Sequence, residues 1–304
     1  MKSTVAAAEM IGYYTRYRNK SSNKSQNKSA DKNTAKSPGT ATHDSKEGTQ
    51  ESPTVILVHG LGCDSSDWTQ VISLLEEHSI DCLSVDLRGH GQSAALGGPY
   101  DIDTMAKDVA KVIEKEKLQN LILVGHSMGT RIILSLRDLI PQYVNRMLFV
   151  DGSRQASGDP ELAKQAIHTL LHDPATCTMF FSHMYAEMFL EGHDPSEQKK
   201  IVDRALSMPQ AVLTEMLADI QAWDAASMTH SLQRLNAATH TRFYVLQSTL
   251  IDGSRRRRPM QPSDTYEYLD LLSKTVKRAR IDILPNTGHF IQLEAPEAIL
   301  HKIS

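Results

Sequence analysis

The chain has 304 residues, of which 40% are hydrophobic and 23% are charged, as in an ordinary globular protein. Its formal net charge of −3 creates no strong field of one sign, which argues against a nucleic-acid partner. No run of about 18 apolar residues is present, so we expect no transmembrane helix. Three cysteines cannot all pair with one another and fit no zinc-ligand spacing, which indicates a reducing compartment and no metal site.

The N-terminal part divides into two segments. Residues 1–18 contain a mixed bulky and polar stretch with three tyrosines at 11–18, which predicts a short strand. The alternative is a transit peptide, because the first 30 residues are basic and contain a single acid, Glu9. Residues 19–52 lack large apolar side chains and are predicted to be a disordered polar insertion. Because the cysteines indicate a reducing compartment, we expect a cytoplasmic protein; the basic N-terminal residues leave a mitochondrial location open.

Residues 53–151 alternate between apolar strand patterns and amphipathic helix patterns. This alternation predicts βαβ units and a mostly parallel sheet flanked by helices. The predicted strands are 54–58, 81–85, 121–124 and 147–150, and the predicted helices are 67–78, 102–117 and 128–138.

Residues 152–242 contain no strand pattern and are predicted to be helical, with helices at 161–172, 175–190, 196–206 and 210–222. Strand patterns return at 243–247 and 280–284, with helices at 264–277 and 296–303. The sequence therefore predicts one α/β core, formed by 53–151 and 243–304, with a helical cap inserted between two of its strands.

Ser127 lies in Gly-His-Ser-Met-Gly, directly after an apolar strand pattern and directly before a helix pattern. A Gly-x-Ser-x-Gly turn in this context forms a nucleophile elbow, in which small residues permit a very tight turn. The helix that follows points its unpaired N–H groups at the same place. Ser127 is therefore the candidate nucleophile.

Three further segments complete the pattern: His-Gly-Leu-Gly at 59–62, Asp-Leu-Arg-Gly-His-Gly-Gln-Ser at 86–93 and Asn-Thr-Gly-His-Phe at 286–290. Together with the elbow, they make the chain resemble the α/β-hydrolase family over about residues 54–304. The resemblance implies an α/β-hydrolase fold with a helical cap.

The resemblance also implies roles for individual residues. His289 would be the general base that takes the proton of Ser127. The backbone N–H groups of Leu61 and Met128 would form the oxyanion hole. Three other histidines flank glycine turns and are expected to be structural: His59, His90 and His126.

The sequence offers three candidates for the acid that would orient His289. The family places it after one of the later strands of the sheet. Asp252 follows the strand at 243–247 and is the first candidate, although the spacing is off by about one residue. Asp151, at the end of the strand at 147–150, is the rival, and Asp224 is a more distant alternative.

The cap would lie over the carboxyl ends of the strands, where such folds bind ligands. Its methionines, among them Met184, either pack its own core or line an adaptable apolar pocket. The aromatic side chains that could line the same pocket are Phe180, Phe181, Tyr185, Phe189 and Trp223. We expect a small hydrophobic acyl substrate and no cofactor. The arginine run 255–258 is interpreted as a solvated loop, with an anion anchor or a nuclear address as alternatives.

These features predict a serine hydrolase that acts on an ester, a thioester or a related acyl substrate through an acyl-enzyme. A C–C bond hydrolase or an acyltransferase would use the same Ser-His apparatus. A non-catalytic binding protein with the same fold is the alternative from another class. The sequence does not give the oligomeric state.

Overall fold

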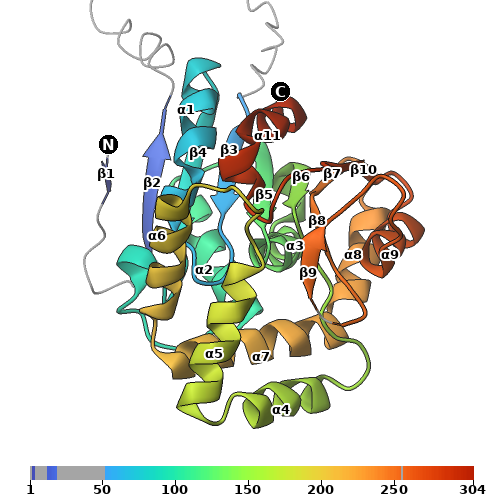
Figure 1. Cartoon of the computed structure of the whole chain (residues 1–304). Coiled ribbons are helices and arrows are strands. Elements are labelled where there is room, and N and C mark those ends of the chain that lie inside the picture. The colour runs from blue at the N-terminus through green and yellow to red at the C-terminus, as the bar shows by residue number, and fades with distance from the viewer. Residues whose placement is uncertain (1, 4–11, 19–51, 255) are drawn as a thin grey trace, which may run out of the picture.

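The computed structural model describes residues 2–3, 12–18, 52–254 and 256–304. The predicted polar insertion, apart from Ser52, lies outside the described residues. Within them, one eight-stranded sheet has the strand order β1-β2-β4-β3-β5-β6-β7-β10 (Figure 1). Its strands are β1 (Lys2–Ser3), β2 (Tyr13–Tyr17), β3 (Thr54–Val58), β4 (Asp81–Asp86), β5 (Leu121–His126), β6 (Val144–Val150), β7 (Arg242–Gln247) and β10 (Arg280–Ile283).

The strands from β4 to β10 run parallel to one another. The strand predicted near the N-terminus is β2, which pairs antiparallel with β4 at the edge of the parallel part. Its residue Tyr14 is fully buried, so this strand belongs to the core. The predicted fold class, a mostly parallel sheet flanked by helices, is confirmed.

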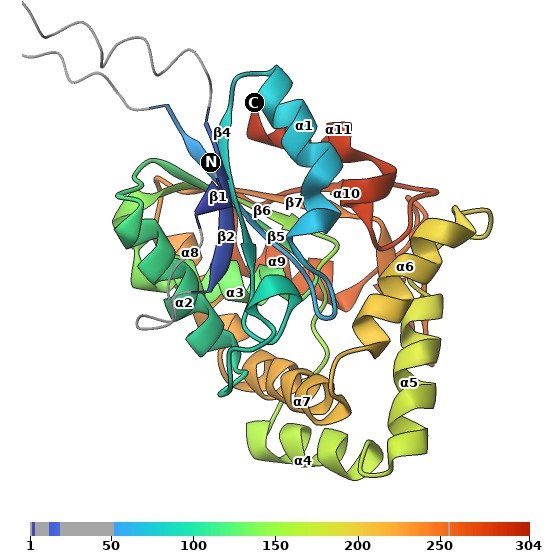
Figure 2. The ribbon, with the colours of Figure 1, turned by 90° about the vertical axis from the view of Figure 1, so that its left-hand side faces the viewer.

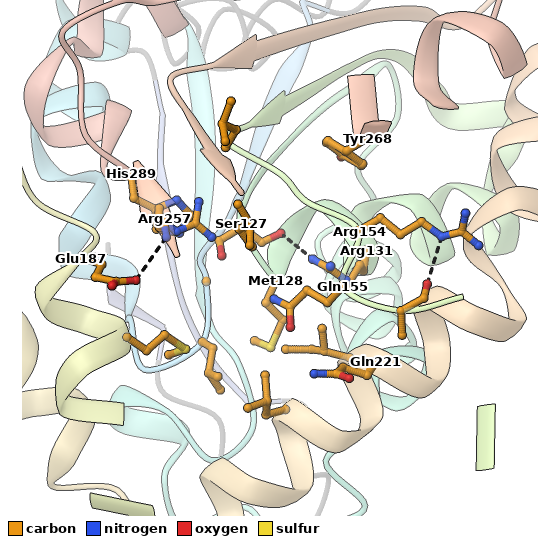
Figure 3. Close-up of a pocket in the computed structure, with 18 of the residues that line it drawn as sticks. Ser127, Met128, Arg131, Arg154, Gln155, Glu187, Gln221, Arg257, Tyr268 and His289 are labelled. Carbon is orange, nitrogen blue, oxygen red and sulfur yellow. Dashed lines mark hydrogen bonds between the residues drawn. The ribbon is translucent and has the colours of Figure 1, made fainter. Parts of the chain in front are cut away.

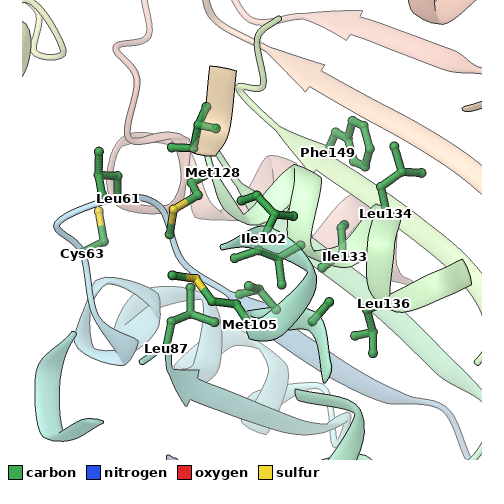
Figure 4. Close-up of a cluster of buried hydrophobic side chains, with 14 of the residues drawn as sticks. Leu61, Cys63, Leu87, Ile102, Met105, Met128, Ile133, Leu134, Leu136 and Phe149 are labelled. Atoms are coloured by element: carbon green, nitrogen blue, oxygen red, sulfur yellow. The ribbon is translucent and has the colours of Figure 1, made fainter. Parts of the chain in front are cut away.

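Helices cover both faces of the sheet (Figure 2). Alternate residues of β3 face opposite sides: Val55 and Leu57 belong to one buried cluster, and Ile56 and Val58 to the other. One face is covered by α1 (Thr69–Glu77), α10 (Ile291–Glu294) and α11 (Pro296–Ile303). The other is covered by α2 (Ile102–Lys115), α3 (Gly129–Leu139), α8 (Met228–Ala237) and α9 (Glu267–Thr275), and Figure 4 shows part of its packing.

Between β6 and β7 the chain forms a helical insertion, residues 152–241, with helices α4 (Pro160–Leu170), α5 (Pro174–Ala186), α6 (Pro195–Leu206), α7 (Gln210–Ala226) and α8. Three of these helices begin with proline after an aspartate whose carboxylate accepts backbone N–H groups: Asp159, Asp173 and Asp194. The sequence predicts no helix of the insertion after residue 222, whereas α7 continues to Ala226 and α8 follows it directly from Met228.

A short hairpin, β8 (Thr249–Ile251) and β9 (Arg257–Pro259), follows β7 and was not predicted. Each of its strands has three residues, too few for an alternating pattern to be recognised. The hairpin brings the arginine-rich segment back toward the carboxyl ends of the sheet strands, beside the site described next. In the described part of the chain, no helix combines the length and apolarity needed to cross a bilayer.

Candidate active site

Ser127 occupies a tight turn between β5 and α3. Its backbone is left-handed, with φ of +53°, a strained conformation for a residue other than glycine. A Cβ on Gly125 would lie 2.4 Å from the Gly129 carbonyl oxygen, and one on Gly129 would lie 2.3 Å from the Val58 oxygen. Only glycine fits at these two positions, and the elbow geometry predicted from the sequence is present.

Ser127 and His289 both line a cavity of about 1170 Å³ between the sheet and the helical insertion (Figure 3). Helices α4, α5 and α7 supply an apolar part of its wall, including Leu162, Phe180 and Leu217. Of the pocket residues suggested from the sequence, Phe180 and Met184 line the cavity. The other aromatic candidates are buried and do not form its wall: Phe181, Tyr185, Phe189 and Trp223.

The carboxylate that contacts His289 belongs to Asp151. The distance from His289 Nδ1 to Asp151 Oδ2 is 2.6 Å, and both side chains are buried. Because Nδ1 carries the proton donated to Asp151, Nε2 keeps its lone pair free to accept a proton. In the described residues, no hydrogen bond joins Ser127 Oγ to His289; such bonds often tighten only when substrate binds.

Asp252, the first candidate from the sequence, does not occupy the position beside His289 that Asp151 takes. It lies in the turn of the β8–β9 hairpin, where its carboxylate accepts the backbone N–H groups of Ser254 and Arg256. Among the described residues, no hydrogen bond or ion pair joins Asp252 to His289. The geometry therefore reverses the preference in favour of the rival, Asp151. Asp224, the third alternative, pairs with an arginine instead.

Asp151 is held by several donors besides His289. The backbone N–H groups of Ser248 and Thr249 lie 2.7 and 2.8 Å from its Oδ1, and Arg257 Nη1 lies 3.2 Å from its Oδ2. Burial raises the pKa of this carboxyl, but the hydrogen bond and charge of His289 and the charge of Arg257 outweigh it and lower the pKa to about 2. Asp151 is therefore ionised across the physiological pH range.

The pKa of His289 is lowered to about 4. Burial is the largest cause, and the positive charge of Arg257 adds to it, while the hydrogen bond and charge of Asp151 act in the opposite direction. His289 is consequently neutral, and able to accept a proton, at neutral pH. Sequence reasoning missed Arg257, because its place beside Asp151 depends on the unpredicted hairpin.

The solvated-loop prediction holds in part for the described residues of the arginine run, because Arg256 and Arg258 are exposed whereas the side chain of Arg257 is largely buried. Arg257 binds Asp151, Arg256 pairs with Glu187 and Arg258 pairs with Asp264. Arg255 lies outside the described residues. The hairpin is thus attached both to the candidate site and to the end of α5.

The two candidate oxyanion donors lie at the same cavity. Met128 precedes α3 and Leu61 follows β3, and both line the cavity wall. Among the described residues, neither backbone N–H donates to a protein acceptor, so both are available to a ligand. The Leu61 carbonyl accepts a hydrogen bond of 2.8 Å from the Tyr185 hydroxyl, which fixes this loop to α5.

The three remaining histidines of the motifs connect loops. His59 Nε2 accepts the N–H of Leu87 at 3.1 Å, and His90 Nε2 accepts the N–H of Gly62 at 3.1 Å. His126 Nε2 donates to the His289 carbonyl oxygen at 2.9 Å. All three are buried and burial lowers their pKa values, so they act as neutral hydrogen-bonding groups.

A buried ion pair connects the helix after Ser127 to the helical insertion. Arg131 on α3 binds Asp224 on α7 through Nε and Nη2, each at 2.7 Å, and the two side chains are 1% and 0% exposed. Arg131 Nη2 also donates to the Ser153 carbonyl oxygen, and Asp224 accepts the N–H of Gln155. Helix α7 is thereby fixed to the elbow and to the chain after β6.

A model of the Alpha/beta hydrolase family matches residues 55–302, which is most of the chain. The chain belongs to the α/β-hydrolase family. The match includes β3, the elbow, the helical insertion and His289, so the four motifs recognised in the sequence lie within one family domain.

Three curated relatives match this α/β hydrolase over segments of 102 to 118 residues. A Haemophilus influenzae protein described as an esterase/lipase is 33% identical over 111 residues, 36% of this chain and 38% of its own length. An sn-1-specific diacylglycerol lipase of Danio rerio is 29% identical over 118 residues, 38% of this chain and 37% of its own. An Acinetobacter baylyi (E)-2-((N-methylformamido)methylene)succinate hydrolase is 30% identical over 102 residues, 34% of this chain and 38% of its own. Each match spans less than two-fifths of the relative.

Solved structures resemble the α/β hydrolase over most of its length. An esterase from Thermogutta terrifontis has a TM-score of 0.65 and 21% identity, covering 83% of this chain and 88% of its own. The enol-lactonase from Burkholderia xenovorans has a TM-score of 0.64 and 19% identity, covering 84% of this chain and 92% of its own. At these identities the likeness shows the fold alone.

Replacing Arg257 by methionine is expected to move the acidic limb of the pH–kcat/KM profile of the hydrolase to higher pH. With neutral His289 as the proposed base, kcat/KM should fall as pH drops through its pKa of about 4. Without the guanidinium, protonated His289 loses a repulsive neighbour, and its pKa rises. Arg256→Met, on the same hairpin but in contact with Glu187, is the control and should leave the limb in place. An unchanged limb in Arg257→Met would contradict the electrostatic role.

Proposed function

We propose that this α/β hydrolase is a serine hydrolase that cleaves carboxylic esters or thioesters through an acyl-enzyme. The observation that carries the proposal is the buried 2.6 Å contact between His289 Nδ1 and Asp151, at a cavity that Ser127 also lines. The likeness to an esterase/lipase and to a diacylglycerol lipase supports the same class of reaction.

In the proposed reaction, Ser127 Oγ attacks the carbonyl carbon of the ester, and His289 Nε2 takes the hydroxyl proton. The negative charge that develops on the carbonyl oxygen is met by the N–H groups of Leu61 and Met128. His289 then gives its proton to the leaving alkoxide or thiolate. Water, deprotonated by His289, attacks the acyl-enzyme and releases the carboxylic acid. Asp151 keeps the imidazole oriented and stabilises its protonated form.

The wall formed by α4, α5 and α7 favours an apolar acyl or alcohol group. Leu162 and Leu170, both on α4, line the cavity although they are 65% and 47% exposed to solvent. Large exposed apolar side chains at a cavity are typical of a surface that a ligand covers.

Labelling with a fluorophosphonate probe tests this function. The folded wild-type protein is expected to react at a single serine, identified as Ser127 by mass spectrometry of the labelled peptide. Hydrolysis of 4-nitrophenyl esters of increasing chain length should then peak at one length, which measures the apolar part of the cavity. A folded protein that neither reacts with the probe nor hydrolyses any ester would favour the non-catalytic alternative.

A further inference from the structure

Four arginines line the cavity: Arg131, Arg154, Arg257 and Arg258. Three of them are ion-paired, with Asp224, Asp151 and Asp264 respectively. Arg154, in the segment between β6 and α4, has no carboxylate at ion-pair distance in the part of the chain that the structure describes. Its Nε donates to the Ala156 carbonyl oxygen at 3.0 Å, which leaves both terminal amino groups without a protein acceptor.

The carboxylates that line the cavity are occupied elsewhere or exposed to water. Asp159 caps α4 and Asp252 caps the hairpin turn through backbone N–H groups. Glu187 binds Arg256 and the backbone of Arg257. Glu267, in the first turn of α9, is exposed to solvent. None of the carboxylates in the described cavity wall therefore forms an ion pair with Arg154.

We propose that the substrate carries a carboxylate, which binds Arg154, while its apolar part lies against α4 and α7. A planar guanidinium with two free amino groups matches a carboxylate in both charge and geometry. One unpaired cation balances a monoanion, whereas a phosphate dianion would need a second. The position of the ester near Ser127 rests on the proposed function; the anion site itself does not.

The test compares esters that differ only in this charge. One pair is the mono-4-nitrophenyl ester of adipic acid and the corresponding methyl-capped diester, which places the carboxylate on the acyl side. The other pair is O-hexanoyl-lactic acid and its amide, which places the carboxylate on the alcohol side. We expect the anionic member of one pair to have a kcat/KM about 10- to 100-fold higher. Equal rates within both pairs would overturn the proposal.

Variants then test whether Arg154 causes the preference for the anionic ester. Arg154→Met should abolish the anionic preference by slowing only the charged ester, and Arg154→Lys should restore part of it. Arg258→Met, which removes a cavity arginine already paired with Asp264, is the matched control and should keep the preference. A preference that survives in Arg154→Met would contradict the assignment.

Calorimetric binding to Ser127→Ala separates this proposal from the proposed function. The anionic esters should bind about 10-fold or more tighter than their neutral partners to Ser127→Ala, and equally to Ser127→Ala/Arg154→Met. This result would support the anion site even if the wild-type protein hydrolysed none of the esters. Equal binding of charged and neutral esters to Ser127→Ala would refute the site even if the protein is a serine hydrolase.

Discussion

Asp151→Asn is expected to lower kcat by about 10⁴-fold, whereas Asp252→Asn is expected to change it by no more than a few-fold. An asparagine amide can donate to the imidazole, which favours the tautomer that presents Nε2–H to the nucleophile, and it no longer balances the protonated ring. The observation behind this expectation is the 2.6 Å contact between His289 Nδ1 and Asp151. Steady-state hydrolysis of a 4-nitrophenyl ester measures both variants.

Folding must be checked for Asp151→Asn, because the same carboxylate also accepts the backbone N–H groups of Ser248 and Thr249 and contacts Arg257. Thermal unfolding followed by circular dichroism provides this check. A large loss of kcat in Asp252→Asn, with Asp151→Asn close to wild type, would identify Asp252 as the catalytic acid and contradict the assignment to Asp151.

Ser127→Ala is expected to lower kcat by about 10⁶-fold and to abolish fluorophosphonate labelling. The methyl group cannot form an acyl-enzyme, and the residual rate would come only from the oxyanion donors and from substrate positioning. Burst kinetics should disappear together with the acyl-enzyme. Substrate binding should remain, because the cavity wall is otherwise unchanged.

Ser157→Ala is the matched control for this variant, since Ser157 lines the same cavity from an exposed loop. It should retain labelling and a rate within a few-fold of wild type. If Ser127→Ala kept its burst phase, another nucleophile would carry the reaction and the elbow would have only a structural role.

The sequence predicted the parts of the molecule that depend on local patterns. The last four residues of β3 and the first four of β5 are continuous apolar runs, and the elbow follows from the spacing of Gly125, Ser127 and Gly129. The helices α4 to α6 carry their own start signals, an aspartate followed by proline. Such signals act within a few residues of chain, so a single sequence is enough to recognise them.

The features that the sequence ranked wrongly or missed depend on contacts between distant segments. Asp151 and His289 are separated by 138 residues, and only the sheet order, which places β6 next to β7 and β7 next to β10, brings them together. Arg257 reaches Asp151 because the chain after β7 turns back as a hairpin of two three-residue strands. Neither pairing leaves a periodic signal in the local sequence.

The Arg131–Asp224 pair bears on how substrate enters. Swinging α7 away from the sheet would break the buried Arg131–Asp224 pair and the hydrogen bonds that its members make to Ser153 and Gln155. We therefore expect substrate to reach Ser127 through an existing opening of the cavity, without movement of α7. The width of that opening would then limit which substrates reach Ser127. Because α7 would not have to move in each catalytic cycle, kcat should not depend on solvent viscosity.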